Sequence, residues 1–176
     1  MSIRIALAGN PNCGKTTLFN AYTGAGKKTA NWPGVTVELS EGSLMHRGRP
    51  VRLVDTPGIY SLDPYTMEET VTRQCIRDQK ADVIIHVADA LLLERSLFLT
   101  MQLLAEGKPL VLALNMMDLV RERGMDIDTE GLSRLLGGIP VIPVSARRRT
   151  GLEELMDAAV EAARARRTAD GSGRFV

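Results

Sequence analysis

The segment that decides the fold is Gly9-Asn10-Pro11-Asn12-Cys13-Gly14-Lys15-Thr16. Two glycines separated by four residues and followed by Lys-Thr are typical of a phosphate-binding loop. The apolar run Ile3–Ala8 precedes this segment, and residues that favour a helix follow it from Thr16 to Tyr22. The pattern therefore lies between a predicted strand and a predicted helix, which is the context it requires. A glycine-rich turn that binds nothing is the alternative interpretation.

The chemistry of a phosphate group explains the residue types in this loop. Glycines let the chain wrap an anion with backbone N–H groups, and the free amides at the start of the next helix point to the same anion. Lys15 would add a positive charge at the β- and γ-phosphates, and Thr16 would offer a hydroxyl to Mg²⁺. The nucleotide-binding residues expected here are Gly9, Asn10, Pro11, Asn12, Cys13, Gly14, Lys15, Thr16 and Thr17.

Length and composition indicate a single soluble domain. The chain has 176 residues, of which 44% are hydrophobic, and its formal net charge is +1. That charge balance argues against a protein that coats nucleic acid and against a strongly basic membrane binder. Its 2 cysteines form neither a disulfide framework nor a four-ligand zinc site. The longest apolar runs are shorter than the ~20 residues of a spanning helix, so the chain as given is not expected to cross a membrane.

Apolar runs alternate with helical patterns along the chain. Strands are expected at residues 3–8, 37–46, 51–54, 82–88, 110–114 and 139–144, which makes a six-stranded sheet. The turn Arg47-Gly48-Arg49 predicts a hairpin, so one edge strand is antiparallel and the rest of the sheet is mostly parallel. Helices between the strands predict a three-layer α/β/α domain over residues 1–167, followed by a flexible tail over 168–176. In such sheets, ligands bind at the carboxyl ends of the strands.

A second motif, Asp55-Thr56-Pro57-Gly58, closes the strand at residues 51–54. A carboxylate at Asp55 can hold the hydration shell of Mg²⁺, and the N–H of Gly58 can contact a γ-phosphate. Loss of that phosphate would release the segment that follows, as in the order–disorder switch of GTPases. Without the phosphate loop, Asp-Thr-Pro-Gly would be interpreted simply as a turn.

A third motif, Asn115-Met116-Met117-Asp118, follows the strand at residues 110–114. The carboxylate of Asp118 can accept hydrogen bonds from N1–H and the 2-amino group of guanine, and adenine offers neither donor. Asn115 is expected to tie this loop to the phosphate loop. Ser145 and Ala146, with Arg147 beside them, follow the last strand and could support the base through a backbone N–H. An Asn and an Asp at this spacing also occur by chance. Only their position after the two phosphate motifs along the chain favours a guanine-binding role.

Together with Asn31-Trp32-Pro33-Gly34-Val35-Thr36-Val37-Glu38 and the extension Ile59-Tyr60-Ser61, these motifs resemble the cytosolic G domain of the ferrous iron transport protein B family (FeoB) over about residues 3–165. The resemblance implies a Ras-like P-loop NTPase fold and potassium activation. It places Thr36 on Mg²⁺ and the γ-phosphate, with Gly34 and Val35 beside the nucleotide. It also places Asn12 on K⁺, together with backbone carbonyls near Ala30 and Trp32.

Two departures from the generic GTPase pattern affect the expected chemistry. Met116 stands where the generic guanine motif has lysine, although the FeoB-like sequences share this methionine. Ile59 occupies the place of the glutamine that orients water in many GTPases. Charge on the transition state would then come from Mg²⁺, Lys15 and K⁺, with Asn12, Thr36 and Gly58 as the other catalytic residues. We expect slow GTP hydrolysis that K⁺ accelerates and Na⁺ does not.

Three functions compete at this stage. The first is a GTP-hydrolysing switch that regulates ferrous iron uptake at the cytoplasmic face of the bacterial inner membrane. By resemblance, the whole protein would continue into a helical domain and a transmembrane iron pore. The soluble fragment could form a homo-oligomer through its switch segments. Nucleic acid would not be a partner. The second is a stand-alone GTPase that associates with RNA or ribosomes, and the third is a nucleotide sensor with negligible turnover. Arg147–Arg149 are expected to be solvated, and His46 is expected to be a surface residue of the hairpin.

Overall fold

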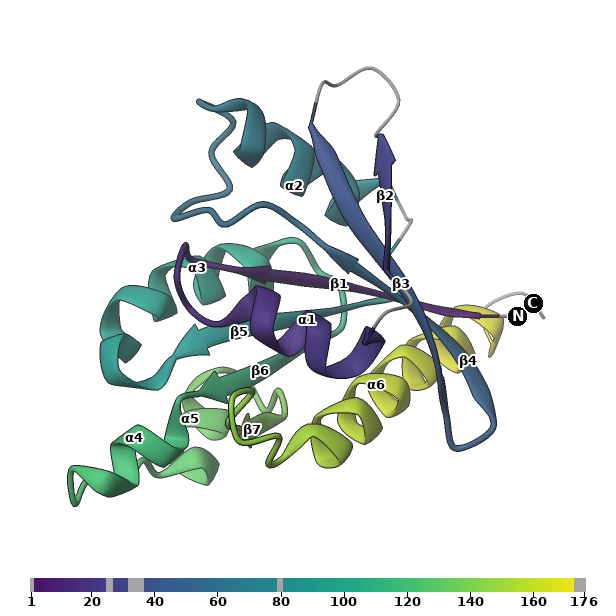
Figure 1. Cartoon of the computed structure of the whole chain (residues 1–176). Helices are drawn as coiled ribbons and strands as arrows, with labels where there is room; N and C mark the ends of the chain where they lie inside the picture. Colours follow the sequence, from purple (N-terminus) through teal and green to yellow (C-terminus); the bar gives the residue numbers. More distant parts are fainter. Residues whose placement is uncertain (1, 25–26, 32–36, 79–80, 173–176) are drawn as a thin grey trace.

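The computed structural model describes residues 2–24, 27–31, 37–78 and 81–172, and these form one sheet of 7 strands in the order β2–β3–β4–β1–β5–β6–β7 (Figure 1). The strands are β1 (Ile3–Gly9), β2 (Lys27–Asn31), β3 (Glu38–His46), β4 (Arg49–Asp55), β5 (Val83–Asp89), β6 (Leu110–Asn115) and β7 (Val141–Pro143). Strands β4, β1, β5, β6 and β7 run parallel, and β3 is antiparallel to both β2 and β4. The loops after the parallel strands therefore emerge at the same end of the sheet.

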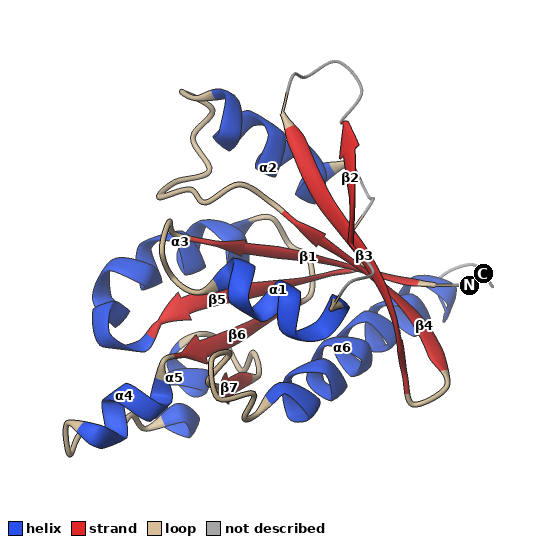
Figure 2. Ribbon diagram, viewed as in Figure 1, coloured by secondary structure: helices blue, strands red, loops and turns tan. Residues whose placement is uncertain are grey.

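Helices cover both faces of this sheet (Figure 2). They are α1 (Lys15–Thr23), α2 (Met67–Arg77), the short 3₁₀ helix η1 (Ala90–Leu92), α3 (Leu93–Ala105), α4 (Met117–Glu122), α5 (Thr129–Leu135) and α6 (Leu152–Ser172). On one face, Phe19 of α1 and Met156 of α6 pack in one core with Ile5 of β1. On the other face, Leu99 of α3 packs in a second core with Ile84 of β5. The predicted three-layer α/β/α architecture is confirmed.

The antiparallel edge of the sheet is wider than predicted. The segment 24–36 contains glycines and a proline and is not among the predicted strands, but β2 forms within it and pairs with β3 from Lys27↔Gly42 to Asn31↔Glu38. Residues 27–31 contain no glycine or proline, and their pairing satisfies the outer backbone groups of β3. The prediction of six strands with one antiparallel edge strand is therefore corrected to seven strands, of which two form the antiparallel edge, among the described residues.

The last helix is longer than predicted. Residues 168–172 were assigned to a flexible tail, whereas α6 continues to Ser172. Arg167 forms an ion pair of 2.8 Å with Asp82, and Arg166 lies 3.5 Å from Asp170, one helical turn further along. The pair with Asp82 holds the polar end of the helix against the body of the domain, and the pair with Asp170 lies within the helix. Among the described residues, no helix has both the length and the apolar character needed to cross a bilayer.

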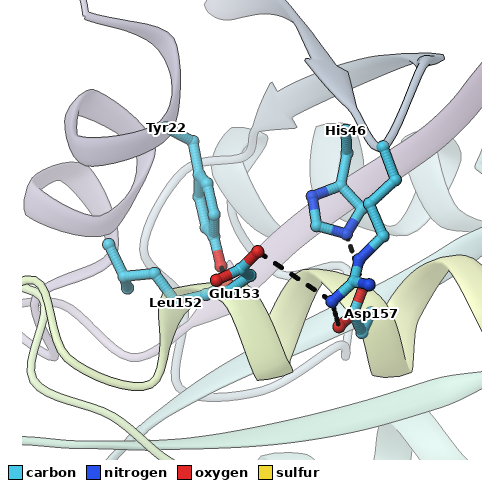
Figure 3. A network of polar contacts seen from close by, with 6 residues as sticks. Tyr22, His46, Leu152, Glu153 and Asp157 are labelled. Carbon is cyan, nitrogen blue, oxygen red and sulfur yellow. Dashed lines mark hydrogen bonds and ion pairs between the residues drawn. The ribbon is translucent and has the colours of Figure 1, made fainter.

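The hairpin between β3 and β4 is fastened to α6 (Figure 3). Nε2 of His46 lies 2.6 Å from Oδ1 of Asp157, and Arg47 donates to Oδ2 of the same carboxylate at 2.6 Å. The hydrogen bond from His46, and then those from Arg47, lower the pKa of Asp157 below its ordinary value. His46 lies at the hairpin, as predicted, but its side chain is only 13% exposed and is paired with Asp157. Its partner comes from an element 111 positions away, which no local pattern indicates.

Candidate functional site

A cavity of about 540 Å³ opens where β1 passes into α1. The residues that line it come from all three predicted motifs: Asn10, Pro11, Asn12, Gly14, Lys15, Thr16, Thr17, Gly58 and Met116. Their loops follow β1, β4 and β6, which are separate in the sequence and aligned in the sheet. The structure therefore brings the phosphate loop, the Asp-Thr-Pro-Gly segment and the start of the guanine motif to one hollow. Loops at the carboxyl ends of parallel strands are the usual place for such a site.

Two of the motif glycines are required by close approach. The backbone of Gly14 has a φ of +87°, and a Cβ atom there would lie 2.1 Å from Nδ2 of Asn115. A Cβ atom on Gly58 would lie 3.0 Å from the Cα atom of Pro11. A side chain at Gly14 would push the third motif away, and one at Gly58 would crowd the phosphate loop. The glycines thus allow three loops to converge.

Lys15 and Asp55 belong to the two loops that are predicted to hold the phosphates, which we call the phosphate side of the site, and their charged groups contact each other. The ammonium of Lys15 donates to the carboxylate of Asp55 and to the backbone carbonyl of Thr56. The two charged side chains are 8% and 12% exposed, so the pair is largely shielded from water. An ammonium has three donors and a carboxylate can accept several hydrogen bonds. An anion in the cavity would therefore compete with Asp55 and Thr56 for the donors of Lys15.

The segment after Asp55 runs beside β1. The hydroxyl of Thr56 donates to the carbonyl of Leu7 at 2.7 Å, and the amide of Ile59 donates to the carbonyl of Gly9 at 3.0 Å. Ile59 is 3% exposed and contributes to the core on the α3 face. An apolar side chain at this position is consistent with the sequence argument that Ile59 cannot orient water, because it points into the core.

The next residues are clamped to α3 by contacts that the sequence did not reveal. The carboxamide of Gln102 accepts from the amide of Leu62 at 2.8 Å and donates to Oγ of Ser61 at 3.1 Å. The guanidinium of Arg95 lies 4.4 Å from the ring centroid of Tyr60. A glutamine and an arginine on a helix usually indicate a solvated face, so no sequence signal could have identified this clamp. It fixes the loop that begins at the predicted γ-phosphate contact.

The loops of Asn115–Asp118 and of Ser145–Ala146 are predicted to hold the base, and we call them the base side of the site. Asn115 joins these two loops to the phosphate loop. Its Nδ2 donates to the carbonyl of Cys13 at 3.0 Å, and its Oδ1 accepts from the amide of Ala146 at 3.0 Å. The predicted link to the phosphate loop is confirmed. In the structure the amide of Ser145 donates to the carbonyl of Thr150 and that of Ala146 to Asn115. Support of a base by Ser145 and Ala146 stays a prediction.

Asp118 lies beside Asn115 at the start of α4. Met116 has a φ of 66°, and this left-handed residue turns the chain from β6 into α4. Nε of Arg148 donates to Oδ2 of Asp118 at 3.2 Å. The side chain of Arg148 is 60% exposed, so the prediction of a solvated arginine is confirmed, and the sequence did not indicate this ion pair. Burial acts to raise the pKa of Asp118, but hydrogen bonds from Ser145, from the amide of Leu119 and from Arg148 outweigh it, and the pKa lies below its ordinary value. The carboxylate is thus ionised, as an acceptor must be.

The remaining predicted site residues fall into three groups, which are residues outside the described ranges, exposed residues and a buried residue. Gly34, Val35 and Thr36 lie outside the described residues. Asn12 is exposed at the cavity with a φ of 64°. Cys13 is buried, and this burial raises the pKa of its thiol, which makes it a packing residue of the loop. Arg147 is exposed next to the base side.

The fold and the convergence of these loops define the class of the protein, a P-loop NTPase of the G-domain type. A family model described as ferrous iron transport protein B matches residues 3–159. The chain belongs to the ferrous iron transport protein B family. The Fe(2+) transporter FeoB of Legionella pneumophila (strain Paris) is 48% identical to it over 153 residues, which are 85% of this chain and 20% of the relative. The chain thus spans about a fifth of the length of the curated relatives it matches.

Solved structures agree with this assignment. The cytosolic domain of the T. maritima FeoB iron transporter in GDP form I has a TM-score of 0.89 and 43% sequence identity, and it matches 93% of this chain and 64% of that chain. The GMPPNP form of the same domain has a TM-score of 0.88 and 43% identity, over 92% and 64% of the two chains. At this identity, the likeness extends beyond the fold to the family.

Proposed function

We propose that this chain binds guanine nucleotides and hydrolyses GTP as the switch module of a ferrous iron transporter. The observation that carries the proposal is Asn115, a buried side chain that ties the phosphate loop to the base-reading loop through the contacts of Cys13 and Ala146. The relatives named as Fe(2+) transporters support the iron context, and the relatives solved in GDP and GMPPNP forms support the ligand. Family membership favours this function over the alternative of an RNA-associated GTPase.

Each side of the site has a task that follows from its chemistry. The amides of the phosphate loop and the ammonium of Lys15 would bind the phosphates, and the amide of Gly58 would contact the γ-phosphate. The ionised carboxylate of Asp118 would accept from N1–H and the 2-amino group of guanine. Against adenine this carboxylate would lack the two donors of the guanine edge, which opposes binding of ATP. Arg147 and the backbone around Ser145 would lie along the base.

The donor set fits Mg²⁺. Thr16 is among the residues that line the cavity, and the carboxylate of Asp55 is paired with Lys15, which also lines it. Thr16 and Asp55 both offer oxygen donors, and Mg²⁺ prefers a few such ligands together with substrate phosphates. Thr36 would be the remaining protein ligand. When bound, the ion would neutralise charge between the β- and γ-phosphates.

We further propose that K⁺ stimulates a slow hydrolysis. Asn12 is exposed, lines the cavity and has a left-handed backbone conformation. A monovalent cation held by Asn12 would add positive charge where other GTPases use an arginine, whose contribution is about 10³–10⁵ in rate. Since Ile59 is buried and cannot orient water, the rate without such a cation should be low.

The whole protein's context is also a proposal. In the longer relatives this module accounts for about a fifth of the chain. We infer that it works at the cytoplasmic face of the bacterial inner membrane, attached through α6 to further domains that include the iron pore. Contacts between switch segments of two copies would then allow a homo-oligomer, and no nucleic acid is required.

A nucleotide titration of this chain tests the proposal. We expect GDP and a non-hydrolysable GTP analogue to bind with Mg²⁺ and ATP to bind at least about 100-fold more weakly, because an acceptor without its donors costs about 1–3 kcal/mol per lost bond. Hydrolysis of GTP should be faster in K⁺ than in Na⁺, and Asn12→Ala should abolish that difference. Equal affinity for GTP and ATP would contradict guanine binding, and binding without turnover would favour a nucleotide sensor.

A further inference from the structure

Arg148 connects the loop after β7 to two carboxylates of α4. Its Nε donates to Oδ2 of Asp118 at 3.2 Å, and its Nη2 donates to Oε1 of Glu122 at 2.6 Å. Asp118 and Glu122 are four positions apart on the helix, so they lie on one face. The side chain of Asp118 is 12% exposed, whereas that of Arg148 is 60% exposed. The arginine therefore covers the predicted base-reading carboxylate from the solvent side.

We propose that Arg148 is a positioning residue that fixes the carboxylate of Asp118 for the guanine edge and thereby sets the discrimination among purine bases. This inference rests on the proposed function, because it requires Asp118 to read the base. The predicted site residues did not include Arg148, which looked like one of three solvated arginines in the sequence. Its role depends on a contact that spans 30 positions of the chain.

The geometry favours holding the carboxylate over blocking it. The guanine edge needs two of the roughly four acceptor positions of the carboxylate, so one of its present donors, which are Ser145, the amide of Leu119 and Arg148, must give up its position when guanine binds. Arg148 occupies a position on Oδ2 alone, and its shorter contact is to Glu122. The guanidinium is thus anchored on the α4 side. Guanine and Arg148 can bind the same carboxylate together.

A second contact steadies the same unit. The backbone amide of Arg148 donates to Oγ of Ser145 at 3.2 Å, and the Ser145 side chain also hydrogen-bonds to Asp118. The loop therefore meets Asp118 through two groups. Without the arginine, Asp118 and Glu122 would repel each other on one helix face, and the Asp118 carboxylate would be free to turn toward water. Preorganised acceptors bind a ligand more tightly than mobile ones.

The test compares the affinities of the intact chain for GDP, IDP and ADP at low ionic strength. Inosine lacks the 2-amino group, so the GDP/IDP ratio reports whether both oxygens of Asp118 are in place. Arg148→Gln should weaken GDP binding about 5-fold, the upper range for an exposed ion pair, and IDP binding by less, so that the ratio falls. Arg148→Lys keeps the charge without the planar fork and should recover part of the loss.

A matched control and a second variant keep the test decisive. Arg121 on α4 is exposed and makes no side-chain hydrogen bond or ion pair with the described residues, so Arg121→Gln should leave the ratio unchanged. Glu122→Gln removes the second anchor of Arg148 and should lower the ratio less than Arg148→Gln does, and the double variant should resemble Arg148→Gln alone. If Arg148→Gln failed to fold, it would bind GDP, IDP and ADP more weakly by the same factor. The GDP/IDP ratio of Glu122→Gln would then be the test of the positioning role.

The outcomes separate the two proposals. If the unchanged chain does not prefer GDP to ADP, the proposed function is wrong. If it does prefer GDP but Arg148→Gln binds GDP with equal or higher affinity and the same GDP/IDP ratio, the proposed function stands and Arg148 is not a positioning residue. Tighter binding in Arg148→Gln would show that the arginine obstructs the base.

Discussion

Asn115 and Lys15 stand on the base side and the phosphate side of the candidate site, and they are held in different ways. Asn115 bonds to backbone groups of Cys13 and Ala146, which need no ligand to form these contacts. Lys15 bonds to Asp55 and to the carbonyl of Thr56, partners that a phosphate would displace. The difference indicates that the base side is built in advance, whereas the phosphate side must exchange partners when a nucleotide arrives. A change of nucleotide should therefore be felt first on the phosphate side.

The segment that would carry such a change is also anchored differently on its two ends. Ile59 is bound to β1 through the carbonyl of Gly9, and the residues that follow are bound to α3 through Gln102. The helix α3 thus holds residues that follow the predicted γ-phosphate contact within a few positions. We expect a change at Gly58 to reach the rest of the domain through this helix.

The largest effect is expected for Asn115→Ala, which removes the link on the base side. The carbonyl of Cys13 and the amide of Ala146 would be left buried without partners, each at a cost of about 1–3 kcal/mol. The free energy of unfolding should fall by about 2–4 kcal/mol, and GDP affinity should fall about 30-fold, which corresponds to about 2 kcal/mol. Denaturant unfolding and calorimetric titration measure the two losses.

The matched control for that variant is Ser133→Ala. Ser133 donates one hydrogen bond to the carbonyl of Ile139 at 2.6 Å, away from the site. Its loss should cost about 1 kcal/mol of stability and leave GDP affinity unchanged. If Asn115→Ala were no more damaging than this control, the base side would not be built by Asn115.

A smaller effect, confined to the phosphate side, is expected for Gln102→Ala. The variant frees Ser61 and the amide of Leu62 from α3, at about 0.5–1.5 kcal/mol for each hydrogen bond. We expect GTP hydrolysis to slow about 5-fold while GDP affinity stays within about 2-fold, because the base side is untouched. Single-turnover hydrolysis and hydrogen exchange at Leu62 provide the measurements.

Met101→Ala is the control on the same helix, since Met101 is 58% exposed. It should change neither the hydrolysis rate nor the exchange of the Leu62 amide. Equal losses of GDP affinity and hydrolysis in Gln102→Ala would mean that the clamp supports the whole site and not the phosphate side alone.

The smallest change is expected when pH alone is varied. The pKa of Asp118 lies below its ordinary value, so the carboxylate is ionised from pH 8 down to about pH 5, and its contribution is lost only as pH falls through the lowered pKa. The ratio of GDP to ADP affinity should therefore be flat over this range. A fall of this ratio centred near pH 6 would show that Asp118 becomes protonated in the site, and it would contradict the prediction that an ionised carboxylate accepts from the base.

The sequence was most informative where function depends on short, contiguous segments. The phosphate loop, Asp55-Thr56-Pro57-Gly58 and Asn115-Met116-Met117-Asp118 each have a spacing set by local backbone geometry, so their place after a strand could be predicted. The contact of Asn115 with the phosphate loop was predicted and is confirmed. The nucleotide, Mg²⁺ and K⁺ roles of these residues stay predictions.

Segments with mixed signals were predicted less well. Glycine and proline on either side of residues 27–31 suggested a continuous loop and concealed β2, which exists because β3 offers it a free edge. The polar residues after 167 suggested a tail, yet Arg167 finds Asp82 and the helix continues. In both cases, tertiary pairing overrode a weak local preference.

By itself, then, the sequence determined the α/β order and the identity of the loops that meet at the cavity, because strand periodicity and glycine spacing are local properties. Only the tertiary structure decided that Gln102 clamps the segment after Gly58, that His46 pairs with Asp157, and that Arg148 bridges Asp118 and Glu122. Glutamine, histidine and arginine are compatible with water on any surface. Their partners lie 26 to 111 positions away, and the packing of the elements alone brings the groups within hydrogen-bond distance.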